Sequence, residues 1–65
     1  MVATANYNMT FDNGRFVKGE VYKYRVDNNL EKIFITTEEH KEQELSFAEF
    51  DILFTVFWKI KKIII

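Results

Sequence analysis

The sequence predicts an α+β domain in which a three-stranded, possibly four-stranded, antiparallel sheet packs with one α-helix, and it predicts that this domain is a homodimer. Three observations lead to this fold class. Apolar and polar residues alternate over much of 7–37, turn-forming residues interrupt that alternation, and a helix-start signal follows at 45–50. Sixty-five residues make one domain at most, so the whole of 1–65 is taken as a single unit.

The first part of the sheet is predicted from period-2 patterns. Aromatic or apolar residues stand at positions 7, 9 and 11, which predicts a short strand over 7–11. Asp12-Asn13-Gly14 is a hairpin-turn signal, because Asn and Gly tolerate the positive φ of tight turns. Residues 16–26 predict a longer strand, in which Gly19 indicates a bulge or a bend.

A second hairpin follows the first. Asp27-Asn28-Asn29 predicts its turn, and residues 30–37 predict the next strand, with Ile33 and Ile35 on one face. The antiparallel pairing of 16–26 with 30–38 is the best supported pairing in the sequence. Residues 38–44 are dominated by charge and predict a connection rather than a strand.

The segment LSFAEFDILF at 45–54 predicts the helix. Ser46 and Glu49 have the S-x-x-E spacing of a capping box, and Leu45 and Phe50 have the spacing of a hydrophobic staple. The end of the helix is ambiguous, since Phe residues continue at helical spacing to position 57 while residues 58–61 alternate. Aromatic and β-branched enrichment favours a strand for the tail. We therefore expect a helix over 47–56 and a strand over 58–64, with Lys59 and Lys61 on its wetter face.

Charge is distributed unevenly, although the net charge is only −1. Six acidic residues stand within 38–51 against a single Lys41: Glu38, Glu39, Glu42, Glu44, Glu49 and Asp51. This acidity argues against nonspecific nucleic-acid binding, which needs a coherent basic face. The hydrophobic share of 48% is high for so short a chain, and it predicts an obligate homodimer whose interface completes the core.

Catalysis is not expected. The chain has no Cys and a single His40 in the charged connection, so no metal or other cofactor is predicted. No phosphate-binding loop or dinucleotide fingerprint occurs. The N-terminus lacks a secretory signal pattern, and the apolar run at 52–65 is too short to cross a bilayer, so a cytoplasmic location and no membrane contact are expected.

Residues 45–54 resemble the small inhibitor of uracil-DNA glycosylase that Bacillus-infecting phages encode. The family pattern, Leu-Ser-apolar-small-acid-Phe-acid-aliphatic-Leu-aromatic, matches these ten residues position by position. A looser likeness covers about half of the chain: Tyr22 and Tyr24 resemble an aromatic strand of the family at a different spacing, and 57–65 resembles its closing strand.

The resemblance implies a homodimer with a three-stranded sheet and one helix that mimics DNA. Such a decoy would block the enzyme's DNA-binding groove in the host bacterial cytoplasm, with carboxylates in place of phosphates and an apolar recess for the enzyme's wedge. Phe50 would form the wall of the recess, Asp51 would bind the enzyme's loops, and Phe54 would make an aromatic contact. The family has Tyr at that last position. Glu38 or Glu39 would supply a further acid, and Glu49 is included among the contact residues.

Other hypotheses remain open at this stage. By spacing alone, Phe50 and Phe54 are a core packing pair, Glu49 and Asp51 are helix-start acids, and 38–44 is a solvated connection. The chain could instead be a small dimeric protein that binds another host DNA-handling or transcription protein. A third hypothesis is a single-strand nucleic-acid binder with a platform of Tyr22, Lys23, Tyr24 and Arg25, which the nearby acidity disfavours.

Overall fold

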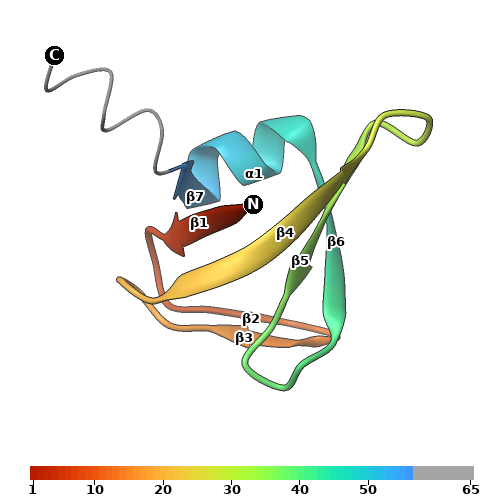
Figure 1. The fold of residues 1–65 in the computed structure, drawn as a ribbon. Helices are drawn as coiled ribbons and strands as arrows, with labels where there is room; N and C mark the ends of the chain where they lie inside the picture. Colours follow the sequence, from red (N-terminus) through yellow and green to blue (C-terminus); the bar gives the residue numbers. More distant parts are fainter. Residues whose placement is uncertain (57–65) are drawn as a thin grey trace, which may run out of the picture.

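The computed structural model describes residues 1–56 and has seven strands and one helix within them (Figure 1). In chain order these are β1 (Val2–Ala5), β2 (Met9–Phe11), β3 (Gly14–Phe16), β4 (Val21–Asp27), β5 (Lys32–Thr36), β6 (Glu42–Ser46), α1 (Phe47–Leu53) and β7 (Phe54–Val56). The predicted α+β class is confirmed. The predicted strand at 58–64 lies outside the described residues.

The main sheet has five antiparallel strands in the order β6-β5-β4-β1-β7, and β2 pairs with β3 in a separate hairpin. The expected sheet of three or four strands is therefore too small. The sequence analysis did not predict β6, β7 or β1 as strands. β1 lies between β4 and β7. Ala3 and Ala5 point into the core from it, and alanine gives only a weak strand signal.

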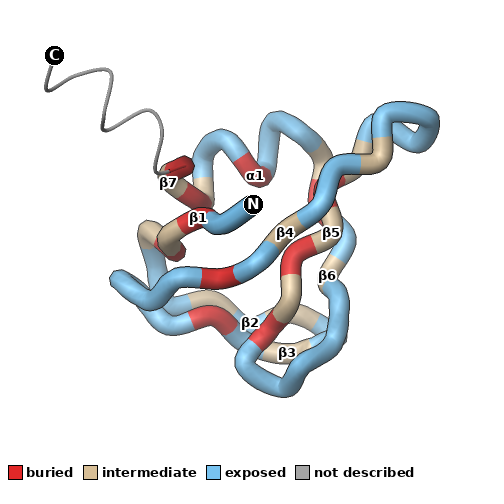
Figure 2. The backbone as a smooth tube through the Cα atoms, in the orientation of Figure 1, coloured by how far each residue is buried: buried red, intermediate tan, exposed pale blue. Residues whose placement is uncertain are grey.

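The core lies on one face of the curved sheet, and Figure 2 shows its buried positions spread over β1, β4, β5, α1 and β7. Phe16 is central to it. Its ring makes edge contacts with Phe11, Tyr22 and Phe54 at centroid distances of 5.9, 4.9 and 5.1 Å. The β2–β3 hairpin thus contributes its last residue to the core that β4 and β7 share.

The two predicted hairpins are present with altered limits. The Asp12–Gly14 turn is confirmed, and it joins β2 to β3 with Met9 opposite Phe16. The continuous strand over 16–26 is wrong, because the chain turns between β3 and β4, where Gly19 has a φ of +86°. The pairing of β4 with β5 is confirmed, with Arg25 opposite Phe34.

The prediction of a charged connection over 38–44 is also wrong for its second half. Residues from Glu42 form the edge strand β6, in which Gln43 and Leu45 face inward and alternate with outward-facing charges. Only Leu45 is a strongly apolar residue in this strand, so the alternation was hidden by the charges around it. The true connection between β5 and β6 is the short loop 37–41.

The helix starts where the capping box predicts, and both reciprocal bonds between Ser46 and Glu49 are present. It ends at Leu53 rather than at 56. Phe54 adopts an extended conformation and begins β7, which pairs with β1. Aromatic and β-branched residues at 54–56 favour a strand, and Phe54 and Val56 are buried on either side of the half-buried Thr55.

Candidate functional site

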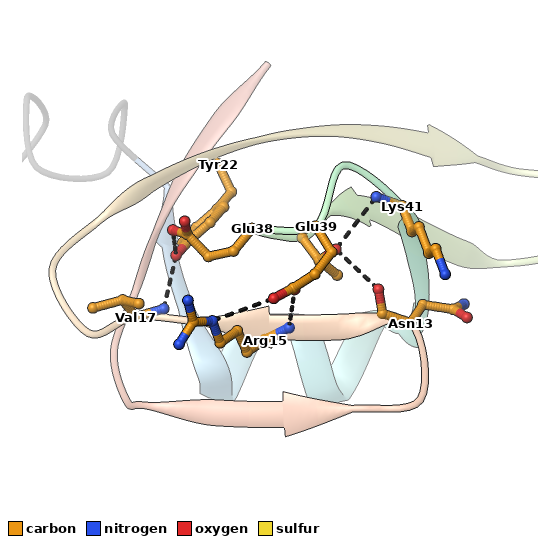
Figure 3. Close-up of polar contacts among 8 residues, drawn as sticks. Asn13, Arg15, Val17, Tyr22, Glu38, Glu39 and Lys41 are labelled. Carbon is orange, nitrogen blue, oxygen red and sulfur yellow. Dashed lines mark hydrogen bonds and ion pairs between the residues drawn. The ribbon is translucent and has the colours of Figure 1, made fainter.

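The loop 37–41 holds two of the predicted contact residues against β3 (Figure 3). Glu39 binds Arg15 twice, since its Oε1 accepts from the backbone N–H at 2.8 Å and its Oε2 lies 3.3 Å from Nε. The backbone N–H of Glu38 donates to the carbonyl of Arg15 at 3.0 Å. The hydrogen bond from the Arg15 amide, helped by the guanidinium charge, lowers the pKa of Glu39. These two glutamates fasten the β2–β3 hairpin to the main sheet.

Gly14 allows this close approach. A Cβ at Gly14 would collide with Glu39 Oε1 and with Thr37 Oγ1, and its φ of +136° is one that residues with a side chain rarely adopt. Thr37 is buried, and its hydroxyl donates to the carbonyl of Asn13 at 3.0 Å. Side chains of the loop 37–41 therefore pack directly against the backbone of the turn at 12–14.

Tyr22 extends the same arrangement into the core. Its hydroxyl donates to Glu38 Oε2 at 2.6 Å and accepts from the backbone N–H of Val17 at 2.7 Å. Burial, together with the hydrogen bond to Glu38, raises the pKa of Tyr22. Lys23 faces the opposite side of β4 from Tyr22, so the proposed nucleic-acid platform does not come together on one face.

A shallow depression of about 480 Å³ opens beside this bond. It is lined by Val21, Tyr22, Lys23, Thr36, Thr37, Glu38 and His40. Glu38 is the only carboxylate in this lining. Its Oε2 is already bonded to Tyr22, so the depression carries a carboxylate committed to a bond within the chain.

Glu42 and Glu44 lie on the outward face of the sheet, and each faces a cation. Arg25 donates to both carboxylate oxygens of Glu42, at 2.8 and 2.9 Å, and its guanidinium lies 4.3 Å from the ring centroid of Phe34. The hydrogen bonds from Arg25 lower the pKa of Glu42. Lys32 Nζ lies 3.8 Å from Glu44. Much of the acidity of 38–51 is therefore balanced by basic residues of β3, β4 and β5.

Phe50 and Phe54 lie in the core. Phe50 is 8% exposed and Phe54 is 2% exposed, and their rings are stacked with centroids 5.5 Å apart. Tyr24 covers Phe50 at a centroid distance of 4.7 Å. Their spacing in the sequence therefore corresponds to packing of the helix on the sheet, and neither ring lies open for a partner in residues 1–56.

The outward side of α1 is different, and we call it the α1 surface: Phe47, Ala48, Glu49, Asp51 and Ile52, all of them exposed. Phe47 is 42% exposed and Ile52 is 65% exposed. The carboxylate of Glu49 is engaged in the capping box, and the hydrogen bond from the Ser46 amide lowers its pKa. Sequence reasoning selected Glu49 and Asp51 but missed Phe47 and Ile52. The sequence analysis expected a longer helix. The observed helix has seven residues and buries Phe50 alone, so Phe47 and Ile52 remain exposed.

Within residues 1–56, no group of three or more potential metal-binding side chains comes together. A search of the same residues for a helix of membrane-spanning length and hydropathy gave none. Comparisons with protein-family models, with curated proteins and with solved structures gave no match.

Proposed function

We propose that this chain is a non-catalytic protein-binding domain that contacts its partner with the α1 surface. The observation that carries the proposal is the exposure of Phe47 and Ile52 on a helix that buries a single residue. At 100° per residue, the four positions 47, 51, 48 and 52 cover an arc of about 140° on the helix. That arc combines an aromatic ring, two aliphatic side chains and the Asp51 carboxylate.

The chemistry of the α1 surface suggests the chemistry of the partner. Apolar side chains at the centre of a contact supply most of the binding free energy, and flanking charges set its orientation. A complementary partner would present an apolar side chain or shallow groove, with a basic residue placed for Asp51. The helix itself contains no basic residue, and the Glu49 carboxylate is engaged in its capping box.

Affinity purification with matched baits tests this proposal. The full chain, Ile52→Asp and Val21→Asp would each be used on a bacterial lysate, and all three would first be checked for folding by circular dichroism. Val21 is 60% exposed on β4, so its variant introduces the same charge on an apolar site away from α1. Proteins recovered by the first and third baits but lost with Ile52→Asp support the α1 surface. Identical recovery by all three baits contradicts it.

Inhibition of host uracil-DNA glycosylase is a second candidate, and one observation favours it. The ten residues that resemble the inhibitor family end β6, form the whole of α1 and begin β7, and they carry Glu49 and Asp51 next to exposed apolar side chains. If the chain is such an inhibitor, Phe47 and Ile52 would make the apolar contacts with the enzyme, because Phe50 and Phe54 are buried. The pairing of Glu39, Glu42 and Glu44 with basic residues counts against DNA mimicry by those three acids.

An activity assay separates the two candidates. Uracil excision by a bacterial uracil-DNA glycosylase would be measured with a large excess of the full chain and with Asp51→Asn. Loss of activity that Asp51→Asn partly restores supports the inhibitor. Full enzyme activity at a saturating concentration of the chain rejects the inhibitor candidate. It does not affect the proposal of a protein-binding domain. Phe50→Ala is unsuitable as a probe, because truncating a buried Phe costs about 3–5 kcal/mol of stability.

A further inference from the structure

We propose that Asn13 is a modification site, at which water converts the side-chain amide to a carboxylate and thereby releases the β2–β3 hairpin from β6. Asparagine is a thermolabile residue, and the residue after it decides how easily the side chain reacts with the backbone. The chain has five asparagines, at positions 6, 8, 13, 28 and 29, and glycine follows only Asn13. Glycine has no side chain to hinder the approach of its nitrogen. The sequence therefore favours reaction at this one position.

The reaction at Asn13 needs no reagent other than water. The backbone nitrogen of Gly14 forms a bond to Cγ of Asn13 and loses its proton, while the bond from Cγ to Nδ2 breaks and ammonia leaves. The product is a cyclic succinimide. Water then adds to one or the other of its carbonyl carbons and breaks the bond from that carbon to the ring nitrogen. This leaves either an aspartate or an isoaspartate, in which the main chain runs through the side-chain carbon. The net reaction is a hydrolysis, so nothing is oxidised or reduced.

Hydrogen bonds hold both reacting groups in the folded chain. Asn13 Nδ2, the leaving group, donates to a backbone carbonyl of β6 at 2.8 Å. The N–H and the carbonyl of Arg15 bond to the loop after β5 (Figure 3), so the alternation along β3 directs the backbone of Gly14 to Phe11, its partner on β2. Ring closure requires both sets of bonds to open, which restricts the reaction to a minor, open state of the hairpin.

Conversion removes a donor that the fold uses. The new carboxylate would place an oxygen against the β6 carbonyl to which Nδ2 now donates, and both of these groups are acceptors. It would also follow Asp12 directly and lie near Glu39, whose Oε1 lies where a Cβ of Gly14 would be. An isoaspartate adds a carbon to the main chain beside Gly14, where a methyl group already collides with Glu39 and Thr37. Either product therefore weakens the attachment of the hairpin.

Asn8 shows the opposite use of an amide in the same part of the chain. Its Oδ1 accepts from the backbone N–H of Lys18 at 2.8 Å, and its Nδ2 makes no bond within residues 1–56. A carboxylate at this position keeps the acceptor. The effect of conversion thus depends on which end of the amide the fold uses, and at Asn13 it uses the donor.

Two substitutions reproduce the change of charge without the reaction. Asn13→Asp should raise the equilibrium constant for unfolding, measured in urea, by about three- to tenfold, because the bond from Nδ2 is lost. Asn8→Asp adds the same charge and keeps its bond, so it should change the constant by less than about twofold. Equal effects of the two substitutions contradict the proposal.

Peptide mapping by mass spectrometry, after incubation of the full chain in mildly alkaline buffer, tests the reaction itself. Asn13 should be converted, and its conversion should be slower in the folded chain than in urea by about tenfold or more. Asn28 and Asn29 are exposed and precede residues with side chains, so in urea both should be converted more slowly than Asn13. An unchanged Asn13 in urea overturns the proposal. Equal rates of conversion in buffer and in urea also overturn it, because the bonds described would then not hold the reacting groups.

The stability of the converted chain completes the test. Ion exchange separates it from the unmodified chain by its added negative charge. The converted chain should unfold at a lower urea concentration than the unmodified chain, and identical urea midpoints would contradict release of the hairpin. Asn13 lies on the hairpin and not on α1, so this outcome is independent of the protein-binding role proposed for the α1 surface.

Discussion

Acidic residues gather in two regions of this chain, and the two regions use them differently. In the loop 37–41, Glu38 and Glu39 are bonded to Tyr22 and Arg15 and hold the β2–β3 hairpin in place. On the α1 surface, Glu49 is engaged in the capping box, and the acids stand beside the exposed apolar side chains of Phe47 and Ile52. A cluster of charge in a sequence is therefore not a binding surface by itself. The difference becomes visible only when the partners of each carboxylate are known.

The largest effect is expected where the loop meets the hairpin. Gly14→Ala should lower the free energy of unfolding by about 3 kcal/mol, because the added methyl group collides with Thr37 and Glu39 at a strained φ. Gly19→Ala is the matched control, since its φ is also positive but nothing lies within 4 Å of the added carbon. About 1 kcal/mol is expected there. Urea unfolding measures both, and equal losses would contradict the packing of the loop against the turn.

A smaller effect is expected from removing the hydroxyl of Tyr22. Tyr22→Phe leaves the Val17 N–H and the Glu38 carboxylate without their partner and should cost about 1–2 kcal/mol. Tyr24→Phe removes a hydroxyl that makes no bond within the described residues and should change stability little. Thermal melts of the two variants would test this, and identical melting temperatures would show that the Tyr22 hydroxyl is dispensable.

Acid should destabilise the fold through the bonded carboxylates of Glu39 and Glu42. The lowered pKa values of Glu39 and Glu42 mean that the unfolded chain takes up protons more readily than the folded chain. Their contribution is complete above the unfolded carboxyl pKa of about 4.3 and is lost as pH falls through the lower folded values. The urea midpoint should therefore decrease on acidification from about pH 5 to pH 3. Glu39→Gln should flatten this decrease more than Glu20→Gln does, and parallel curves would contradict it.

The smallest effect on stability is expected on the α1 surface. Ile52→Ser should change the free energy of unfolding by less than about 0.5 kcal/mol, because Ile52 is 65% exposed. Phe54→Leu, at a buried position, should cost more than 1 kcal/mol and serves as the comparison. A large loss with Ile52→Ser would mean that the side chain packs within the chain, and the α1 surface would then lose its central residue.

Local signals predicted the turns and the helix start well. The Asp12–Gly14 turn, the β4–β5 hairpin and the Ser46–Glu49 capping box depend on residues close together in the sequence. β1 was missed because alanine gives a weak strand signal, and the burial of Ala3 and Ala5 depends on long-range pairing with β4 and β7. The early end of the helix has the same cause, since β7 forms against β1.

The candidate site was harder to predict for a related reason. The acids of 38–51 stand out in the sequence, but the partners of Glu39 and Glu42 lie on strands far away in the sequence. Arg25 reaches Glu42 across β5, and Arg15 reaches Glu39 from a separate hairpin. Neither pairing follows from charge or spacing. Both depend on the order and register of strands, which the sequence analysis did not predict.

The pairing of β7 with β1 has a consequence for synthesis of the chain. Ala3 lies opposite Val56, and Phe54 packs on Phe16. The pairing of β1 and the aromatic cluster around Phe16 can therefore be completed only after β7 has been synthesised. Before β7 is available, β1 lacks one of its two neighbouring strands, and the ring of Phe16 lacks its contact with Phe54. Contacts of such large sequence separation slow folding. We expect the nascent chain to expose aromatic surface until residue 56 has left the exit tunnel.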